Sequence, residues 1–402
     1  MADLLEIGVM FAALALMGVA ANRLNKSVIP FYIVIGMLLS PAVAGELLST
    51  ELLVVEPTEF IVIGAELGIV FLLFFLGLEF NLDRLLESKE RIGKAGTIDL
   101  VINFGAGLIL GWFLFGEPLA AFLAAGIVYI SSSAIITKSL IDLGWIANDE
   151  AGPMLGTLVY EDLFIAVYLA VAAALVAGGD DVVDAAVSVG TGMGFILVLL
   201  LAVYFGTAWF ERTLAVNSNE FTVLRVIGIT VLIAGGALAL GVSEAVAAFF
   251  VGMAFSSTSH VHELEELLEP VRDTFAAVFF FWIGLETDPA LFASVAVVLA
   301  IAIAVVVTTP TKLVSGYLGG RVYDLDARRS TRVGLGMVTR GEFSLIIATI
   351  ALSGAGAGIS VATANEINAF AVGYVLFMSI LGTILMQYSE PFEEFVTARV
   401  ED

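Results

Sequence analysis

Long apolar runs recur along the whole 402-residue chain, with only short polar stretches between them. A helix needs about 20 mostly apolar residues to cross a hydrocarbon core about 30 Å thick. Charged residues make up 14% of the chain, which is too few to cover these runs with a water-exposed surface. The pattern predicts an all-α polytopic membrane protein with thirteen crossings. They are placed at residues 4–22, 28–44, 59–80, 97–115, 119–138, 152–176, 185–208, 222–240, 242–256, 271–285, 290–316, 331–352 and 364–387.

The composition argues against several kinds of chemistry. The chain has no Cys, which excludes disulfides, thiolate metal sites and cysteine nucleophiles. Its two His, His260 and His262, both lie in a polar stretch that we expect to be a solvated inner loop. We therefore expect neither an enzyme nor a bound cofactor. The net charge of −23 argues against a nucleic-acid partner, and the acidic, Lys-poor composition suggests a halophilic source.

The distribution of basic residues predicts the orientation. With thirteen crossings and the N-terminus outside, the Lys and Arg residues fall at the inner ends, apart from Lys138, Lys312 and Arg340 inside segments. The outer loops then carry only acidic charges. Basic residues are enriched in cytoplasmic loops, so we expect an outer N-terminus and a cytoplasmic C-terminus in a prokaryotic plasma membrane.

Two motifs recur with one spacing. The sequence Gly-Leu-Glu ends the third segment at 77–79 and the tenth at 284–286, an offset of 207 residues. The same offset carries the polar run 131–138, in the fifth segment, onto 338–345 in the twelfth. Each run is the most polar stretch of its crossing, so a chance match of both features is improbable.

A third match extends this relation to another pair of segments. Val-Ile-Gly-Met at 34–37 corresponds to Phe-Val-Gly-Met at 250–253, with an offset of 216 residues. Matching segments run in opposite directions through the membrane, which is the pattern of an inverted-topology repeat. We expect one repeat over about 1–176, a second over about 222–387, and a linking helix at about 185–208.

The polar runs predict two broken helices. Ser131, Ser132 and Ser133 follow one another in mid-membrane, where hydroxyl groups compete for backbone hydrogen bonds. A break leaves uncompensated helix dipoles, which Lys138 can offset at the first run and Arg340 with Glu342 at the second. Paired broken helices in two inverted halves indicate a transport site. Alternatively, these hydroxyls only join neighbouring continuous helices.

The sixth segment carries two adjacent acids. Asp162 lies ten residues beyond Gly152, about 15 Å along the helix and near the midplane. Glu161 points about 100° away, and Lys312 in the eleventh segment lies at a similar depth. One carboxylate can pair with Lys312 while the other holds either a proton or a small cation. This competition would couple the two fluxes, whereas a purely structural ion pair would not.

These residues resemble the monovalent cation:proton antiporter superfamily, in particular its Kef-type and NapA-type membrane domains, along essentially the whole chain. The motifs that carry the resemblance are Gly77-Leu78-Glu79, Thr137-Lys138 with the Ser run before it, Glu161-Asp162, His262 to Glu265 with Pro270, Phe280 to Glu286, and Thr339 to Phe343. The resemblance implies a NapA/NhaA-like antiporter fold with thirteen helices, of which two are discontinuous and cross.

The resemblance also implies roles for parts and residues. It implies a homodimer, with scaffold helices at about 1–44 and 185–256 and an ion-transporting core at about 59–176 and 271–387. It makes Asp162 the carrier of cation and proton and Lys312 the partner of the preceding acid. Glu161 at that preceding position differs from the Asp or Gln of the family. Kef-type regulation would require a separate cytosolic subunit that binds nucleotides.

The expected function is exchange of a monovalent cation for protons by alternating access, with Na⁺ favoured over K⁺ and Li⁺. Asp162 would bind the cation, and Glu161, Ser132, Ser133 and Thr137 would complete the site, since hard cations prefer oxygen ligands. Arg340, Glu342, Lys138, Lys312 and Glu79 would balance charge, with Glu79 near Arg340. The alternatives are a subunit of a potassium efflux channel or antiporter, and an ion-coupled organic-anion transporter of the same fold.

Overall fold

The computed structural model confirms that the protein is all-α. It describes residues 2–24, 26–47, 54–79, 82–177, 194, 218–239, 244–256, 258, 261–287, 289–356 and 358–400. In these ranges the β structure is limited to one isolated bridge between Ala355 and Ile359. The linking helix expected at 185–208 lies outside them. Among the described helices, seven are long and apolar enough to cross a membrane.

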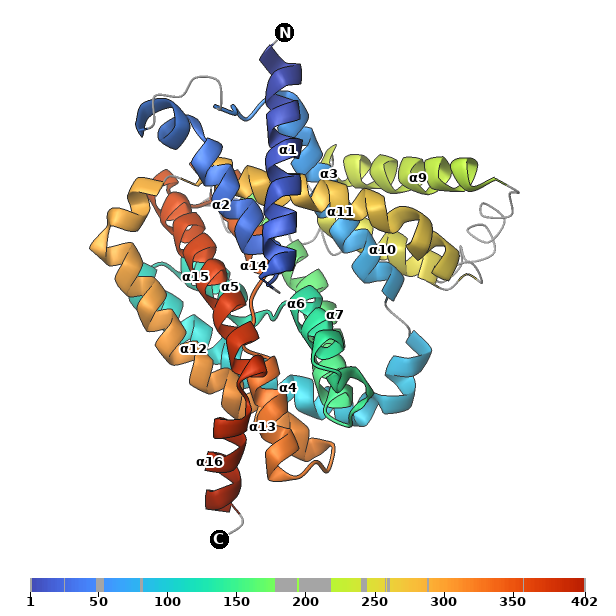
Figure 1. The fold of residues 1–402 in the computed structure, drawn as a ribbon, viewed down its shortest axis with the longest axis vertical. Coiled ribbons are helices and arrows are strands. Elements are labelled where there is room, and N and C mark those ends of the chain that lie inside the picture. The colour runs from blue at the N-terminus through green and yellow to red at the C-terminus, as the bar shows by residue number, and fades with distance from the viewer. Residues whose placement is uncertain are drawn as a thin grey trace. The chain divides into compact units, whose positions relative to one another are not determined.

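Figure 1 shows the order of the helices along the chain. The α-helices are α1 (Ala2–Arg23), α2 (Ile29–Leu39), α3 (Glu59–Glu79), α4 (Leu82–Phe115), α5 (Pro118–Tyr129), α6 (Ser133–Asp142), α7 (Ala151–Ala177), α9 (Asn219–Ala239), α10 (Glu244–Ser256), α11 (Val261–Glu286), α12 (Val295–Val322), α13 (Ala327–Gly336), α14 (Glu342–Ser353), α15 (Val361–Gln387) and α16 (Glu390–Val400). A π-helical turn covers Pro41–Leu47, and short 3₁₀ helices cover Trp145–Ala147 and Pro289–Ala293.

Contacts between residues divide the chain into two compact units. The first unit comprises Met1–Leu16, Tyr32–Asp83 and Ala166–Glu286, and the second comprises Met17–Phe31, Arg84–Ile165 and Thr287–Asp402. These two units are defined by how densely their residues pack. The scaffold and core expected from the sequence are defined instead by movement of one part against the other. That expected division therefore stays a prediction.

In the first unit, α2 approaches α11 and α3 packs against α10 through pairs of glycines. A Cβ atom on Gly36 would lie 3.1 Å from the Cα of Gly284, and one on Gly252 would lie 3.0 Å from the Cα of Gly77. Gly284 follows Gly77 by 207 residues and Gly252 follows Gly36 by 216, the two offsets found in the sequence. Only glycine permits backbones to approach this closely. Each glycine motif therefore packs against the unlike motif from the other half of the chain.

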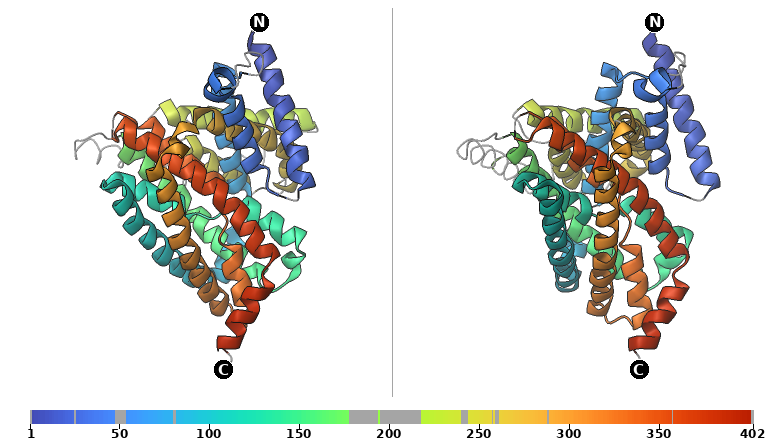
Figure 2. Two further views of the ribbon diagram at one scale, coloured as in Figure 1. Left: turned by 60° about the vertical axis from the view of Figure 1, so that its left-hand side comes forward. Right: turned by 90° about the vertical axis from the view of Figure 1, so that its left-hand side faces the viewer.

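The second unit contains a bundle in which α12 contacts α13 and α15, and α14 contacts α5 and α15. α12 and α15 run side by side in Figures 1 and 2. α12 and α13 approach closely because a Cβ atom on Gly316 would lie only 2.6 Å from the Cα of Gly334. Small residues at helix contacts are typical of membrane proteins.

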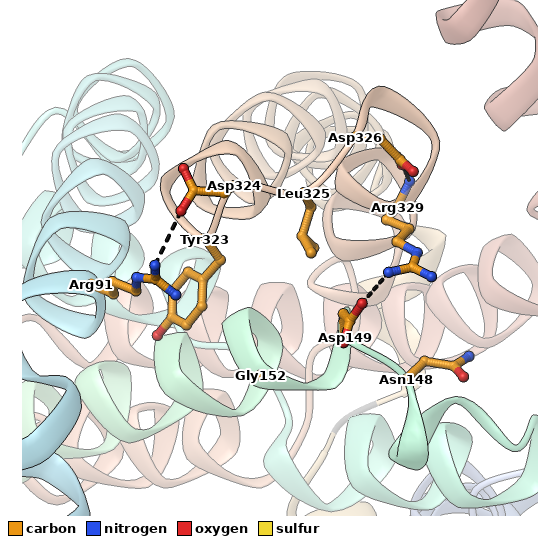
Figure 3. Close-up of a pocket in the computed structure, with 9 residues that line it drawn as sticks. All are labelled: Arg91, Asn148, Asp149, Gly152, Tyr323, Asp324, Leu325, Asp326 and Arg329. Carbon is orange, nitrogen blue, oxygen red and sulfur yellow. Dashed lines mark hydrogen bonds and ion pairs between the residues drawn. The ribbon is translucent and has the colours of Figure 1, made fainter.

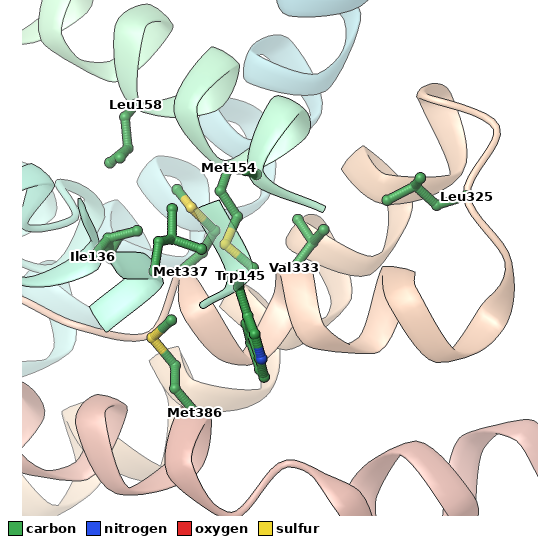
Figure 4. Packing of buried hydrophobic residues seen from close by; sticks show 10 residues of the cluster. Ile136, Trp145, Met154, Leu158, Leu325, Val333, Met337 and Met386 are labelled. Atoms are coloured by element: carbon green, nitrogen blue, oxygen red, sulfur yellow. The ribbon is translucent and has the colours of Figure 1, made fainter. Parts of the chain in front are cut away.

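A hydrophobic cluster supports the end of this bundle near α13. Met154 of α7, Met337 and Met386 gather around Trp145 and Val333 (Figure 4). All five side chains are buried, and together they join α7, α13 and α15. Unbranched Met side chains fill irregular gaps of this kind. The cluster holds α13 at the point where its helix stops.

Two expected crossings are interrupted. The crossing at 119–138 consists of α5, which ends at Tyr129, and α6, which begins at Ser133. The crossing at 331–352 consists of α13, which ends at Gly336, and α14, which begins at Glu342. Both interruptions fall within the polar runs that the sequence analysis identified.

Two helices start earlier than expected. α4 begins at Leu82 rather than near 97, and α11 begins at Val261 rather than near 271. The prediction that His262 lies in a loop was wrong, although its side chain is exposed. Pro270 has no N–H to donate to the carbonyl of Glu266, one turn earlier in α11. It is tolerated there because both residues are solvent-exposed. Acidic residues in the first turn also favour this start, since they complement the helix dipole.

Candidate functional site

The two interruptions contact each other inside the second unit. The backbone N–H of Ser132 donates to the carbonyl of Thr339 over 3.3 Å, and Ser131 Oγ lies 3.2 Å from the carbonyl of Met337. Gly341 fits only without a side chain, because a Cβ there would lie 2.7 Å from the Cβ of Ser132. The non-helical segments therefore pair backbone with backbone, which compensates for the helical hydrogen bonds that both have lost.

Arg340 occupies the carbonyl ends of two half-helices. Its fully buried guanidinium donates from Nε to one carbonyl of α5 over 2.9 Å and from Nη1 to three carbonyls at the end of α13 over 2.9–3.1 Å. The four acceptors are Val128, Met337, Val338 and Thr339. A positive charge is favourable at helix C-termini, so the side chain stabilises both interruptions at once.

Glu342 occupies the opposite, amide ends. It is the first residue of α14, and its buried carboxylate accepts from Ser132 Oγ over 2.8 Å and from Ser133 Oγ over 3.5 Å. Ser132 also caps α6, because its Oγ accepts from the N–H of Ile135 over 3.3 Å. Negative charge is favourable at helix N-termini. Glu342 thus lies at the amide ends of the half-helices, and Arg340 lies at carbonyl ends. The sequence analysis named both as residues that offset the helix dipoles.

Glu161 of α7 connects the first interruption to Lys312 of α12. Its Oε2 accepts from the backbone N–H of Ser131 over 2.6 Å, and its Oε1 accepts from Ser131 Oγ over 3.0 Å. Lys312 Nζ lies 2.6 Å from the same Oε1, and neither side chain is exposed. The depth argument expected one of the two acids beside Lys312, and the structure brings together the pair that the family resemblance implied. Glu161 is held by the interrupted segment as well as by its counter-charge.

A second carboxylate, which the sequence analysis missed, also binds Lys312. Asp99 of α4 lies 2.7 Å from Lys312 Nζ through Oδ2, and its Oδ1 accepts from Asn103 Nδ2 over 2.8 Å and Ser315 Oγ over 2.6 Å. Asn103 also donates to Ser315 over 2.8 Å, so it joins α4 to α12 as expected. The predicted crossing begins at residue 97, which places Asp99 at its end rather than inside the membrane. The i, i+4 spacing of Asp99 and Asn103 on one helix face was the available signal.

Aromatic rings enclose this charged cluster on one side. Lys312 Nζ lies 5.1 Å from the ring centroid of Tyr129, a cation–π distance. Tyr129 packs edge-on against Phe164 at 5.2 Å, and Phe104 packs against Phe164 at 5.5 Å. These rings exclude water from the cluster, which strengthens its internal hydrogen bonds and raises the cost of unbalanced charge.

The remaining candidates are placed less closely. Asp162 follows Glu161 on α7 and is 7% exposed, so it is buried but not sealed. Thr137 is half-buried in α6, and the hydrogen bonds of the described residues do not join it to either acid of α7. The side chains of Lys138 and Glu79 lie outside the described part of the structure, so their charge-balancing roles stay predictions.

A cavity of about 590 Å³ opens at the ends of the three helices that carry the cluster (Figure 3). It is lined by Arg91 of α4, Gly152 of α7 and Tyr323 after α12, among others. Arg91 pairs with Asp324 over 3.1 Å across its mouth. Arg91 precedes Asp99 by eight residues, about 12 Å of helix, so the cluster lies further along α4 and outside this cavity.

A multi-helix membrane chain in which two interrupted helices meet beside buried carboxylates has the architecture of a secondary ion transporter. A family model described as "Sodium/hydrogen exchanger, transmembrane" matches residues 9–387, and the chain belongs to this family of transporters. The resemblance to cation:proton antiporters that the motifs indicated is therefore confirmed.

Individual proteins agree with this assignment. The chain is similar to the K(+)/H(+) antiporter subunit KhtU of Bacillus subtilis (strain 168), with 36% identity over 386 residues that cover 96% of this chain and 93% of that protein. It is 28% identical over 399 residues to the ammonium/H(+) antiporter subunit AmhT of Alkalihalophilus pseudofirmus, covering 96% and 93%. The solved structure of the sodium proton antiporter MjNhaP1 from Methanocaldococcus jannaschii matches with a TM-score of 0.71 at 16% identity, covering 98% and 99%. This last likeness concerns the fold.

Proposed function

We propose that the protein exchanges a monovalent cation for protons by alternating access, with Asp162 as the group that binds each in turn. One observation carries this proposal. Two adjacent buried acids lie on α7, and the first is tied both to the interruption at Ser131 and to Lys312. We assign the second acid, Asp162, which is buried but 7% exposed, as the carboxylate for the transported ion. A carboxylate that holds either a proton or a cation links the two fluxes.

The cation shell would combine Asp162 with oxygen atoms of the first interruption. Ser132 lies in that segment and Ser133 begins α6 directly after it, and exposed backbone carbonyls accompany every break in a helix. Oxygen ligands of this kind suit alkali cations. We favour Na⁺ as the substrate. K⁺ is the second candidate, since KhtU, at 36% identity, is named as a K(+)/H(+) antiporter subunit. The word "subunit" in that name supports a partner chain, and we propose that this partner is a separate cytosolic regulatory subunit.

We further propose thirteen crossings in two inverted repeats, with the N-terminus outside and the C-terminus in the cytoplasm. The reciprocal glycine contacts support the repeat. Gly36 meets Gly284 and Gly252 meets Gly77, and exchanging the two halves turns one contact into the other. The fold likeness to an antiporter structure supports the division into a scaffold, through which two copies would form a homodimer, and a moving core.

Replacing Asp162 by Asn tests the central role. Proteoliposomes with a pH-sensitive dye inside should show no cation-driven proton movement for Asp162→Asn, whereas Na⁺ or K⁺ should elicit it in the wild type. Glu366→Gln, an exposed acid of α15, serves as the matched control and should exchange normally. Retained exchange in a folded Asp162→Asn protein would contradict the proposal.

A further inference from the structure

Lys312 is shared between two carboxylates rather than paired with one. Its Nζ lies 2.7 Å from Asp99 Oδ2 and 2.6 Å from Glu161 Oε1, and the three side chains are at most 2% exposed. With all three groups ionised, the cluster has one negative charge in excess. A buried charge without a partner is costly, so the cluster favours uptake of one positive charge. A proton on one of the two carboxylates supplies it.

The two carboxylates are anchored to different parts of the unit. Asp99 is held by Asn103 of its own helix and by Ser315, which lies three residues after Lys312 on α12. Asp99 and Lys312 therefore share one set of continuous helices. Glu161, in contrast, takes its other hydrogen bonds from Ser131 in the interrupted segment. A rearrangement of that segment would act on Glu161 and would leave the contact between Asp99 and Lys312 intact.

We propose that Asp99 is a positioning residue: it is the resident counter-ion that keeps Lys312 charged and in place while Glu161 takes up and releases a second proton. This proposal rests on the proposed exchange function. In the step, the Glu161 carboxylate accepts one proton and becomes a neutral carboxylic acid, and Lys312 stays an ammonium paired with Asp99. The cluster passes from one excess negative charge to none.

The other titratable groups around the cluster do not replace Asp99. Tyr129 of α5 presents the face of its ring to Lys312, and Asp162, next to Glu161 on α7, is the proposed carrier of the cation. Without Asp99, protonation of Glu161 would leave Lys312 as a buried ammonium with no carboxylate partner. That state is strongly disfavoured. Exchange would then proceed on Asp162 alone, with one proton for each cation.

The experiment measures charge movement rather than rate. Wild-type and Asp99→Asn proteins are reconstituted, and the membrane potential at which imposed pH and cation gradients balance is determined. The net charge moved per cation should fall from about one elementary charge in the wild type to none in Asp99→Asn, with exchange retained. Glu161→Gln should give the same loss, and Glu366→Gln should behave as wild type.

A milder substitution provides the test if the Asp99→Asn protein does not fold. Ser315→Ala removes one anchor of Asp99 and should reduce the voltage dependence partially. An unchanged balance potential in the folded Asp99 or Ser315 variants would show that Asp99 has only a structural role. Complete loss of exchange in folded Asp99→Asn, or voltage-independent exchange in the wild type, would overturn the inference equally. Wild-type protein without cation-driven proton movement would instead remove the proposed function itself.

Discussion

At the residue scale, the site is organised by a few fully buried charges that each serve more than one partner. Arg340 binds carbonyls from two half-helices, and Lys312 binds two carboxylates. A buried charge whose hydrogen bonds are all made contributes little to the net free energy of unfolding. Its removal, however, leaves several buried groups without a hydrogen-bond partner. Substitutions here should therefore act on folding and on transport together.

Arg340 offers the clearest test of this principle. Replacing it by Met should lower the free energy of unfolding by about 3 kcal/mol or more, because each buried carbonyl left without a donor costs about 1–3 kcal/mol. Thermal unfolding of the purified protein in detergent measures the change. Lys94→Met, at an exposed position of α4, is the matched control and should leave the unfolding temperature nearly unchanged. Equal unfolding temperatures for the two variants would refute the capping role.

At the element scale, α16 is fastened to the half-helix α13 by ion pairs to its buried residue Glu393. Glu393 accepts from Arg328 Nε over 2.5 Å and from Arg332 Nε over 2.7 Å. Arg332 also donates to Glu150, which directly precedes α7, over 2.8 Å. The family match ends at residue 387, so α16 lies beyond the matched residues. Its ion pairs connect it to the half-helix that leads to Arg340.

The stabilisation that comes from the ion pairs of Glu393 should be lost at low pH. Burial raises the pKa of Glu393, but hydrogen bonds from Arg332, Ser389 and Arg328 and the charge of Arg332 outweigh burial and lower the pKa to about 2. The unfolded value is about 4.5, so the stabilisation is complete above pH 4.5 and is lost as the pH falls toward 2.

The measurement is the unfolding temperature between pH 6 and pH 3, compared for the wild type and Glu393→Gln. The wild type should lose its advantage over the variant as the pH drops below about 4.5, because Glu393 of the unfolded chain then takes up a proton, whereas the folded carboxylate, with its pKa of about 2, stays ionised. A constant difference between the two proteins across this range would show that Glu393 is not charged in the folded state.

At the scale of the whole molecule, the absence of cysteine from the chain makes the proposed topology directly testable. Ala362 and Glu394 are both exposed, and thirteen crossings put the first outside and the second in the cytoplasm. Ala362→Cys should react with a membrane-impermeant maleimide in intact cells. Glu394→Cys should react only after permeabilisation. The reverse pattern would invert the orientation, and reaction of both in intact cells would contradict the odd number of crossings.

The sequence predicted most of the elements but only part of the site. Depth counting placed Lys312 level with the two acids of the sixth segment, because a helix converts residue number into distance, and the family resemblance selected Glu161 as its partner. Asp99 was missed because the start of its helix was set by hydropathy, which ignores polar turns beyond the lipid. Three of the four carbonyls bound by Arg340 lie in non-helical backbone, whose path no periodicity encodes. His262 was misassigned because average hydropathy outweighed the helical spacing of Leu264, Leu267 and Leu268, of which Leu264 and Leu268 are buried in the structure.

The reciprocal glycine contacts have a consequence for biosynthesis. The early motif at Gly36 meets its partner only when Gly284 has been synthesised, and Gly77 must wait for Gly252. The first unit thus combines helices from both halves of the chain. The helices of the first half cannot finish packing while the ribosome is still synthesising the second half. The nascent chain must remain incompletely assembled in the bilayer until roughly two thirds of it has been translated, so the first unit is completed late and as a whole.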